Sequence, residues 1–377
     1  MKLQMLAKTI LRNLWILLLP LPFGLQRLLA SHPDWVEQVY VRRFFPLISA
    51  PLRTLSSIPP FSITEIVTIL APGLLLILLY FLFQAIRHKR WLAWLKKVAL
   101  PSIWILTVIA WLFILLHGLN YVREPVARSF SLPVRERSAA ELADAARWVI
   151  DQATIARLAC EEDPTGVFQL QAPIKTTLRQ ANAGYQIAAK TWPLLQGATA
   201  RPKSVWLSHF WSYTGITGVY MPLLVEANVN TDQPEYLLPA TVDHELAHTI
   251  GFAREDEAGF VGFLAGISSP YPDYRYSSYA DATVRLLNSL MATDADAYAA
   301  VAKAVPAPIW RDIAAANDYW LQFAGPVQET SNQINNAYLQ ANLQTDGVHS
   351  YGRMVDLLLA WYEQNNQQQT LPEALPS

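Results

Sequence analysis

Asp243-His244-Glu245-Leu246-Ala247-His248 is the stretch that decides how the whole chain is interpreted, because it holds two histidines four residues apart. On an α-helix, residues i and i+4 share one face, so both imidazoles can bind one metal ion. Catalytic zinc takes three protein ligands and leaves a fourth position to water. Glu245 follows the first histidine directly, which places its carboxylate beside that water as general base. The stretch therefore predicts a Zn²⁺ site with His244 and His248 as ligands and Glu245 as the catalytic residue.

The flanking residues predict that this stretch forms a partly buried helix over about 239–250. Pro239 suits the first turn of a helix, and Gly251 stands where a helix C-terminus favours glycine. Apolar residues surround the motif, so we expect its polar side chains to be buried as well. Buried imidazoles and carboxylates need partners, and a metal ion supplies one.

The third metal ligand is expected on a following helix at about 255–267. One class of zinc peptidases has a histidine or aspartate six residues after the second histidine, and Arg254 at that position excludes it. Glu257 begins a row of bulky apolar residues that we expect to face the core, Phe260, Val261 and Leu264. Glu255 begins a row of glycines, Gly259, Gly262 and Gly266. Helical facing favours Glu257 as the ligand, ahead of Glu255 and then Asp256, although an acidic first turn would account for two of the three.

The chain before about residue 120 is dominated by Leu, Ile, Trp and Phe, unlike the remainder. Residues 66–86 and 98–117 form uninterrupted apolar runs, each long enough at about 1.5 Å per residue to cross a hydrocarbon core of about 30 Å. A third candidate at about 13–30 contains prolines and Arg27, and fits a first span or an uncleaved signal anchor. We therefore predict a membrane region over 1–120 with two or three transmembrane helices.

Basic residues indicate how these helices are oriented. Five of them lie between the two strong runs, Arg87, Lys89, Arg90, Lys96 and Lys97. The positive-inside rule places this loop in the cytoplasm, so everything after residue 120 is expected outside. Three arginines in the segment 31–62 disagree mildly with this orientation, Arg42, Arg43 and Arg53.

The remainder of the chain predicts a mainly α-helical domain with a small β-sheet. A linker is expected at 121–137, the catalytic domain at 138–363 and a disordered tail at 364–377. Ser138-x-x-Glu141 fits a capping box at the first helix of the domain.

Strands are expected at 204–208 and at 216–225, where Pro222 indicates an edge strand. Peptidases with this motif bind extended substrates along an edge strand, so residues 215–225 are a candidate substrate platform. A purely structural hairpin explains the pattern equally well.

The overall composition excludes several classes of function. The formal net charge is −1, which offers no basic field for nucleic acid. Cys160 is the only cysteine, which excludes a disulfide framework and any zinc site made of several thiolates.

Several stretches, the motif among them, resemble a family of bacterial membrane proteins, domain-of-unknown-function family 3810. The resemblance rests on residues 243–258, 215–222, 226–230, 276–279 and 350–352. It implies a zincin-like hydrolase domain outside the membrane, without a substrate. Glu257-Ala258-x-Phe260 is also similar to the ImmA/IrrE-type metallopeptidases, in which a Glu-Ala pair on the next helix supplies the third ligand. That similarity supports Glu257.

A peptidase also needs a donor to the developing oxyanion, and Tyr351 and Tyr276 are candidates that lie in resembling stretches. We therefore expect a multi-pass protein of the bacterial cell membrane with an extracytoplasmic zinc metallopeptidase domain, in which metal-activated water cleaves peptide or amide bonds. Its expected partners are the lipid bilayer and a protein, peptide or cell-wall peptide substrate, with no nucleic acid. The alternative is a non-catalytic sensor or scaffold with a structural zinc site.

Overall fold

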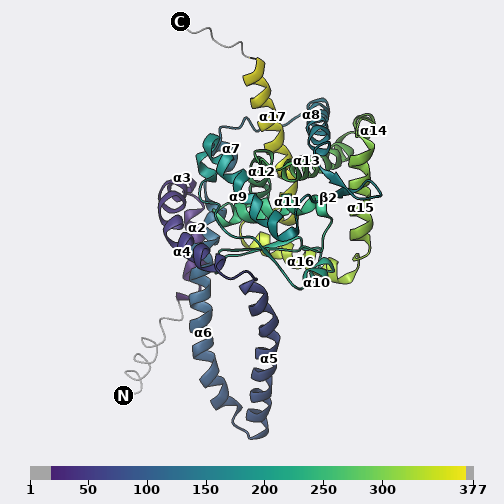
Figure 1. Ribbon diagram of the computed structural model, residues 1–377. Coiled ribbons are helices and arrows are strands. Elements are labelled where there is room, and N and C mark those ends of the chain that lie inside the picture. Colours follow the sequence, from purple (N-terminus) through teal and green to yellow (C-terminus); the bar gives the residue numbers. More distant parts are fainter. Residues whose placement is uncertain (1–17, 371–377) are drawn as a thin grey trace.

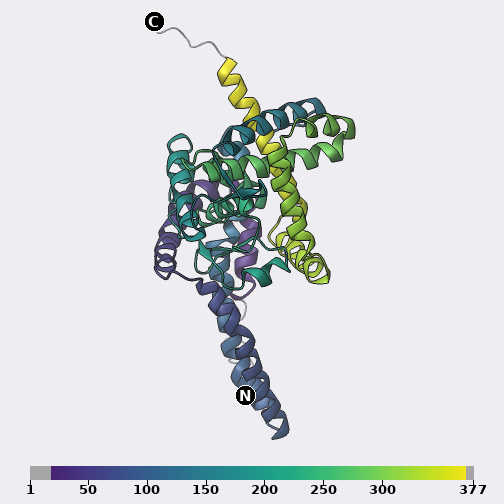
Figure 2. The same cartoon turned by 45° about the vertical axis from the view of Figure 1, so that its right-hand side comes forward.

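The computed structural model describes residues 18–370, in which a long two-helix hairpin projects from a body of packed helices (Figure 1, Figure 2). The chain is mainly helical with small sheets, as predicted. The helices, including the π-helix η2 and the longer 3₁₀ segments η3 and η6, are α2 (Leu21–Leu29), α3 (Pro33–Trp35), η2 (Val36–Phe44), α4 (Phe45–Ser57), α5 (Ile63–Arg87), α6 (Trp91–Leu116), η3 (Gly118–Val122), α7 (Val126–Ser129), α8 (Ala139–Arg157), α9 (Ile174–Thr191), α10 (Ser208–Ser212), α11 (Leu238–Thr249), α12 (Glu255–Ile267), α13 (Pro272–Thr293), α14 (Ala295–Ala302), α15 (Ala307–Leu321), α16 (Pro326–Ala341), η6 (Gly347–Arg353) and α17 (Met354–Thr370).

The projecting hairpin consists of α5 and α6, which are both long and apolar enough to cross a membrane. They contain the two strong apolar runs of the sequence, apart from the last residue of the second run. Most large apolar side chains of α5 are exposed, as a lipid-facing helix requires. The final turn of α6 differs, because Ile114 and Leu116 are buried inside the body.

The third candidate span is only partly described, since residues 13–17 lie outside the described residues. Its described part forms α2, which at nine residues is about 14 Å long and too short to span alone. This helix packs against α6 and η3, and the Gln26 side chain donates a hydrogen bond to the Gly118 carbonyl at 2.7 Å. Within residues 18–370, α5 and α6 are the two helices that meet the requirements for a span.

The segment before the hairpin belongs to the body, contrary to the predicted membrane region of 1–120. Val36, Tyr40 and Phe45 are buried in a cluster with residues of α6 and η3. Glu37 is fully buried and pairs with Arg123 at 2.9 Å. Neither helix length nor composition reveals such a pair, because its partners are 86 residues apart.

The predicted linker at 121–137 is likewise part of the folded body at its start. Tyr121, Arg123 and Val126 are all buried, and the Arg123 guanidinium also donates to the Gly251 carbonyl at 3.0 Å. The prediction of a capping box at α8 is confirmed, with Ser138 and Glu141 bonded reciprocally. At the other end, α17 continues to Thr370, so the tail predicted to be disordered from residue 364 is helical up to that point.

A three-stranded sheet lies beside the hairpin, with strand order β3 (Lys203–Ser204), β5 (Glu226–Val229), β4 (Gly218–Met221). Strand β3 runs parallel to β5, and β4 runs antiparallel to it. A separate antiparallel sheet of two strands pairs β1 (Glu161–Glu162) with β2 (Phe168–Gln169). The edge position of β4 agrees with the indication from Pro222, which follows its last residue. The strand predicted at 204–208 is shorter, because α10 begins at Ser208.

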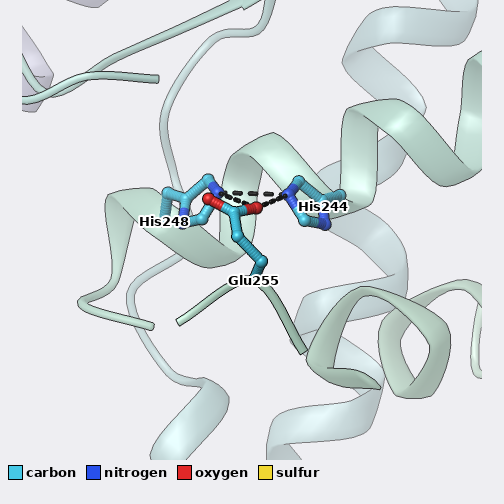
Figure 3. A group of neighbouring side chains, drawn as sticks. All are labelled: His244, His248 and Glu255. Carbon is cyan, nitrogen blue, oxygen red and sulfur yellow. Dashed lines mark hydrogen bonds and ion pairs between the residues drawn. The ribbon is translucent and has the colours of Figure 1, made fainter. Parts of the chain in front are cut away.

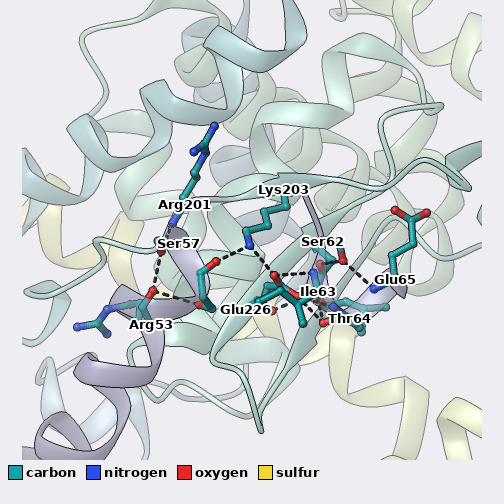
Figure 4. A network of polar contacts seen from close by, with 12 residues as sticks. Arg53, Ser57, Ser62, Ile63, Thr64, Glu65, Arg201, Lys203 and Glu226 are labelled. Carbon is teal, nitrogen blue, oxygen red and sulfur yellow. Dashed lines mark hydrogen bonds and ion pairs between the residues drawn. The ribbon is translucent and has the colours of Figure 1, made fainter. Parts of the chain in front are cut away.

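The body holds the hairpin through a group of polar contacts that we call the hairpin clamp, made of the buried side chains of Glu226 and Lys203 and of Ile63 and Thr64 at the start of α5 (Figure 4). Glu226 on β5 accepts hydrogen bonds from the first backbone N–H groups of α5, at 3.1 Å from Ile63 and 2.8 Å from Thr64. Lys203 on β3 pairs with the same carboxylate at 2.7 Å, and both side chains are at most 1% exposed. A carboxylate at a helix N-terminus is favoured by the helix dipole, so the clamp fixes α5 to the sheet.

Candidate metal centre

Three side chains from α11 and α12 converge at the centre of the body (Figure 3). The Nε2 atoms of His244 and His248 lie 3.1 Å apart. Glu255 Oε2 lies 3.1 Å from Nε2 of His244 and 3.7 Å from Nε2 of His248. These donor atoms could hold one metal ion, because all three lie within 4.8 Å of one another. The convergence of His244 and His248 follows from their spacing on α11.

Glu257 does not lie with the histidines, although helical facing favoured it over Glu255. Its carboxylate accepts a hydrogen bond from the Val126 backbone N–H at 2.8 Å and pairs with Arg254 at 2.8 Å. Burial raises its pKa, while the charge of Arg254 lowers it. Glu257 thus joins the segment before α8 to α12. Glu255, and not Glu257, lies beside the two histidines, where the third metal ligand had been predicted.

The glycine row of α12 explains why Glu255 points to the histidines. A Cβ atom at Gly262 would lie 2.9 Å from the backbone nitrogen of His244, so α12 crosses α11 in close contact at this point. A Cβ atom at Gly259 would lie 3.9 Å from the His244 ring and one at Gly266 would lie 3.0 Å from the Asp243 carboxylate, although Met354 and Ser278 respectively are nearer. The row of small residues is therefore the face that meets the motif helix, and Glu255 at its start shares that face.

Gly262→Ala is expected to destabilise the protein by about 1–3 kcal/mol, because the added methyl group would force the two helices apart. Denaturant unfolding of the full-length protein in detergent measures this change. Gly352→Ala is the matched control, since a Cβ there meets no atom within 4 Å. Equal stability of the two variants would contradict the close helix crossing.

The donor set fits a divalent cation. His248 Nδ1 lies 2.7 Å from the Phe252 carbonyl, and an Nδ1–H donated there leaves the lone pair on Nε2, facing the other two donors. Burial lowers the pKa of His248, but the charge and hydrogen bond of Glu255, the charge of Glu245 and the hydrogen bond to Phe252 together raise it to about 9. Burial raises the pKa of Glu255, but the two histidines bring it well below its usual range. The cluster thus favours a positive charge between its donor atoms, which a bound cation would provide.

Glu245 lies next to this cluster on the same helix, against the edge strand. A Cβ atom at Gly218 of β4 would overlap its carboxylate, so a larger residue there would displace the Glu245 side chain. Its Oε2 atom is buried and has no hydrogen-bond partner among the described residues. Burial raises the pKa of Glu245 to about 8, which is suitable for a group that exchanges protons near neutral pH.

The two tyrosine candidates have different positions. Tyr351 on η6 lines the cavity at the cluster, and its hydroxyl interacts with Glu255 and Asn335. Tyr276 lies away from the cavity, on a buried face of α13, and its hydroxyl donates a hydrogen bond to the Asp312 carboxylate. Asp312 also pairs with Arg157 at 2.8 Å, so Tyr276 belongs to a buried network between α8, α13 and α15. Tyr276 was predicted as a site residue, but the structure places it outside the lining of the cavity, in this network.

A family model described as "Protein of unknown function (DUF3810)" matches residues 40–359. The chain belongs to this family. The match covers the hairpin, the sheet and the cluster together, and it confirms the resemblance to domain-of-unknown-function family 3810. No curated protein and no solved structure shows a significant match to the chain.

Further residues of this DUF3810 protein lie at the site and were missed in the sequence. His117, at the end of α6, is buried with its ring 6.1 Å from that of His248. It had been counted as the last residue of an apolar run, and a polar residue there is a signal for function. Arg285 and Asp281 form an ion pair at 2.7 Å on the cavity wall. Their i, i+4 spacing is that of an ordinary surface pair, so no pattern in the sequence marks them as site residues.

The cluster of this DUF3810 protein opens into a cavity of about 1280 Å³. One wall is the edge strand with its flanking residues 214–223, and another is α16 with Asn332 and Asn335. The remaining wall comes from α6 and the segment around α2. The cavity thus joins the donor cluster, the edge strand and the apolar hairpin.

Proposed function

We propose that this protein is a membrane-anchored, zinc-dependent metallopeptidase-like hydrolase that cleaves peptide or amide bonds at the outer face of a bacterial cell membrane. The observation that carries the proposal is the convergence of His244, His248 and Glu255 with the buried Glu245 beside them. Two histidines, one glutamate and an open position form a ligand set of catalytic zinc. The order edge strand, motif helix and ligand helix supports a zincin-like arrangement.

The roles of the residues follow from their positions. His244, His248 and Glu255 would hold the zinc ion, which when bound lowers the pKa of water and polarises the substrate carbonyl. Glu245 takes a proton from the attacking water as oxygen adds to the carbonyl carbon. The C–N bond then breaks, and Glu245 delivers the proton to the leaving nitrogen. Tyr351 is suited to donate a hydrogen bond to the developing oxyanion.

The proposed orientation rests on the hairpin. Its tip is remote from the body and bears Arg87, Lys89 and Arg90, which favours a cytoplasmic tip (Figure 1). Since a hairpin returns to the side it left, the segments before α5 and after α6 lie together outside. Two of the conflicting arginines have partners in the body, because Arg42 pairs with Glu37 and Arg53 donates to the Thr249 carbonyl.

Zinc content tests the ligand assignment. The full-length protein, purified with zinc present, is expected to contain about one zinc ion per chain by elemental analysis. His248→Ala and Glu255→Gln should lose it, because the first removes a donor nitrogen and the second replaces an anionic carboxylate with a neutral amide, a much weaker ligand. Glu257→Gln is the matched control on the same helix and should keep it.

Two results would contradict the ligand assignment or the proposed hydrolase. Loss of zinc from Glu257→Gln with retention in Glu255→Gln would reverse the assignment of the third ligand. A wild-type protein without zinc after preparation in excess metal would overturn the hydrolase and leave a membrane-anchored binding or scaffold protein.

A further inference from the structure

The shape of the cavity indicates what kind of substrate the site takes. At one end it is lined by the donor cluster and Glu245. At the other end its walls are apolar and come from the hairpin and from residues beside it, Leu19, Phe23, Leu106, Ile109, Ala110 and Phe113. We call this end the apolar arm.

The apolar arm leads from the donor cluster toward the region where we propose the bilayer lies. Leu106 is eleven residues before His117 on the same helical segment, which corresponds to about 16 Å along the axis. Phe113 contacts the His117 ring, so the arm is continuous with the wall of the site. Water would wet such a surface poorly, whereas a hydrocarbon chain matches it.

The other walls are suited to a peptide. The edge strand β4 borders the cavity and can pair with an extended main chain. The wall from α16 offers neutral amide and hydroxyl groups, Ser331, Asn332 and Asn335. Among residues 18–370, Arg27 and Arg285 are the only lysine or arginine residues that line the cavity, and Arg285 is paired with Asp281. This lining favours amide groups over a phosphate headgroup.

We infer that the substrate is a peptide carrying a fatty-acyl chain, with the chain seated in the apolar arm and a backbone amide at the donor cluster. The inference rests on the proposed function and specifies its substrate class. The acyl chain reaches the arm laterally from the bilayer.

The matched variants are Ile109→Trp and Leu112→Trp. Both residues are on α6 and have similar exposure, 40% and 42%. Only Ile109 lines the cavity, so a tryptophan there obstructs the arm, whereas a tryptophan at Leu112 remains on the outer surface of the hairpin.

The test is photo-crosslinking of the full-length protein in lipid nanodiscs with N-palmitoyl-dialanine that carries a diazirine near the end of its chain. Mass spectrometry is expected to locate adducts at residues 106–113 or at Phe23. Unlabelled N-palmitoyl-dialanine should compete for this labelling, and N-acetyl-dialanine should not. Ile109→Trp should reduce labelling at least tenfold, and Leu112→Trp should leave it unchanged.

Labelling spread over the outer faces of α5 and α6, with equal yields in both variants, would overturn the inference. Competition by lysophosphatidylglycerol as strong as that by N-palmitoyl-dialanine would instead indicate a phospholipid and would also overturn it. Because crosslinking needs neither zinc nor turnover, its result is independent of the proposed hydrolysis. Labelling in the arm without zinc binding would refute the function alone, and cleavage of soluble peptides without labelling would refute the substrate class alone.

Discussion

Glu245→Gln is expected to lower kcat for amide hydrolysis by about 10²–10⁴-fold, the usual contribution of a general base. Glutamine preserves the shape of the side chain but cannot accept the proton. Glu245 is not among the three converging donors, so zinc content should remain at the wild-type level. The measurement is kcat on a peptide identified by screening with the wild-type protein, together with elemental analysis of each preparation.

The control for this variant is Glu257→Gln. It also removes a buried carboxylate from this region, but that carboxylate contacts Val126 and Arg254 and not the donor cluster. Its kcat should stay within about threefold of the wild type, a difference of less than about 0.7 kcal/mol in barrier. If Glu245→Gln kept full activity with zinc bound, the proposed role of Glu245 would be wrong.

Glu226→Ala is expected to destabilise the full-length protein by about 3–5 kcal/mol, the effect of removing one partner from a buried ion pair. The Lys203 ammonium group would remain buried without its charge partner, and two N–H groups of α5 would lose their acceptor. Unfolding by denaturant in detergent, followed by circular dichroism, measures the change.

Two further variants make this result specific. Adding Lys203→Met to Glu226→Ala should recover part of the loss, because the unpaired charge is then removed. Asp144→Ala breaks an exposed pair with Arg147 and should change stability by less than about 0.5 kcal/mol. A similar small effect for Glu226→Ala would show that the hairpin is not held by this carboxylate.

What could be predicted from the sequence depended on local spacing. The pairing of His244 with His248 and the capping box at Ser138 both follow from the geometry of a single helix. The apolar runs of α5 and α6 could be found in the same way, from length and composition.

What could not be predicted depended on which helix faces meet. Glu257 was favoured because it lies on the side of α12 with bulky apolar residues. The contact with α11 is made instead by the glycine side of α12, where a bulky residue would prevent close approach. For Tyr276, the hydroxyl group suggested catalysis, but its partner Asp312 lies on a different helix. The buried pair of Glu37 with Arg123 could not be predicted for the same reason, because it joins two segments that are far apart in the sequence.

The hairpin clamp has a consequence for which bonds can be cut. Glu226 binds the first turn of α5 to the sheet that carries the edge strand, beside the helix of the proposed general base Glu245. If the hairpin spans the membrane as proposed, the distance from Glu245 to the bilayer would then be set by this anchor. The site would therefore lie at a fixed distance from the membrane surface. Bonds at one height above the lipid headgroups would be reached, and chemically identical bonds nearer to or farther from the surface would be spared.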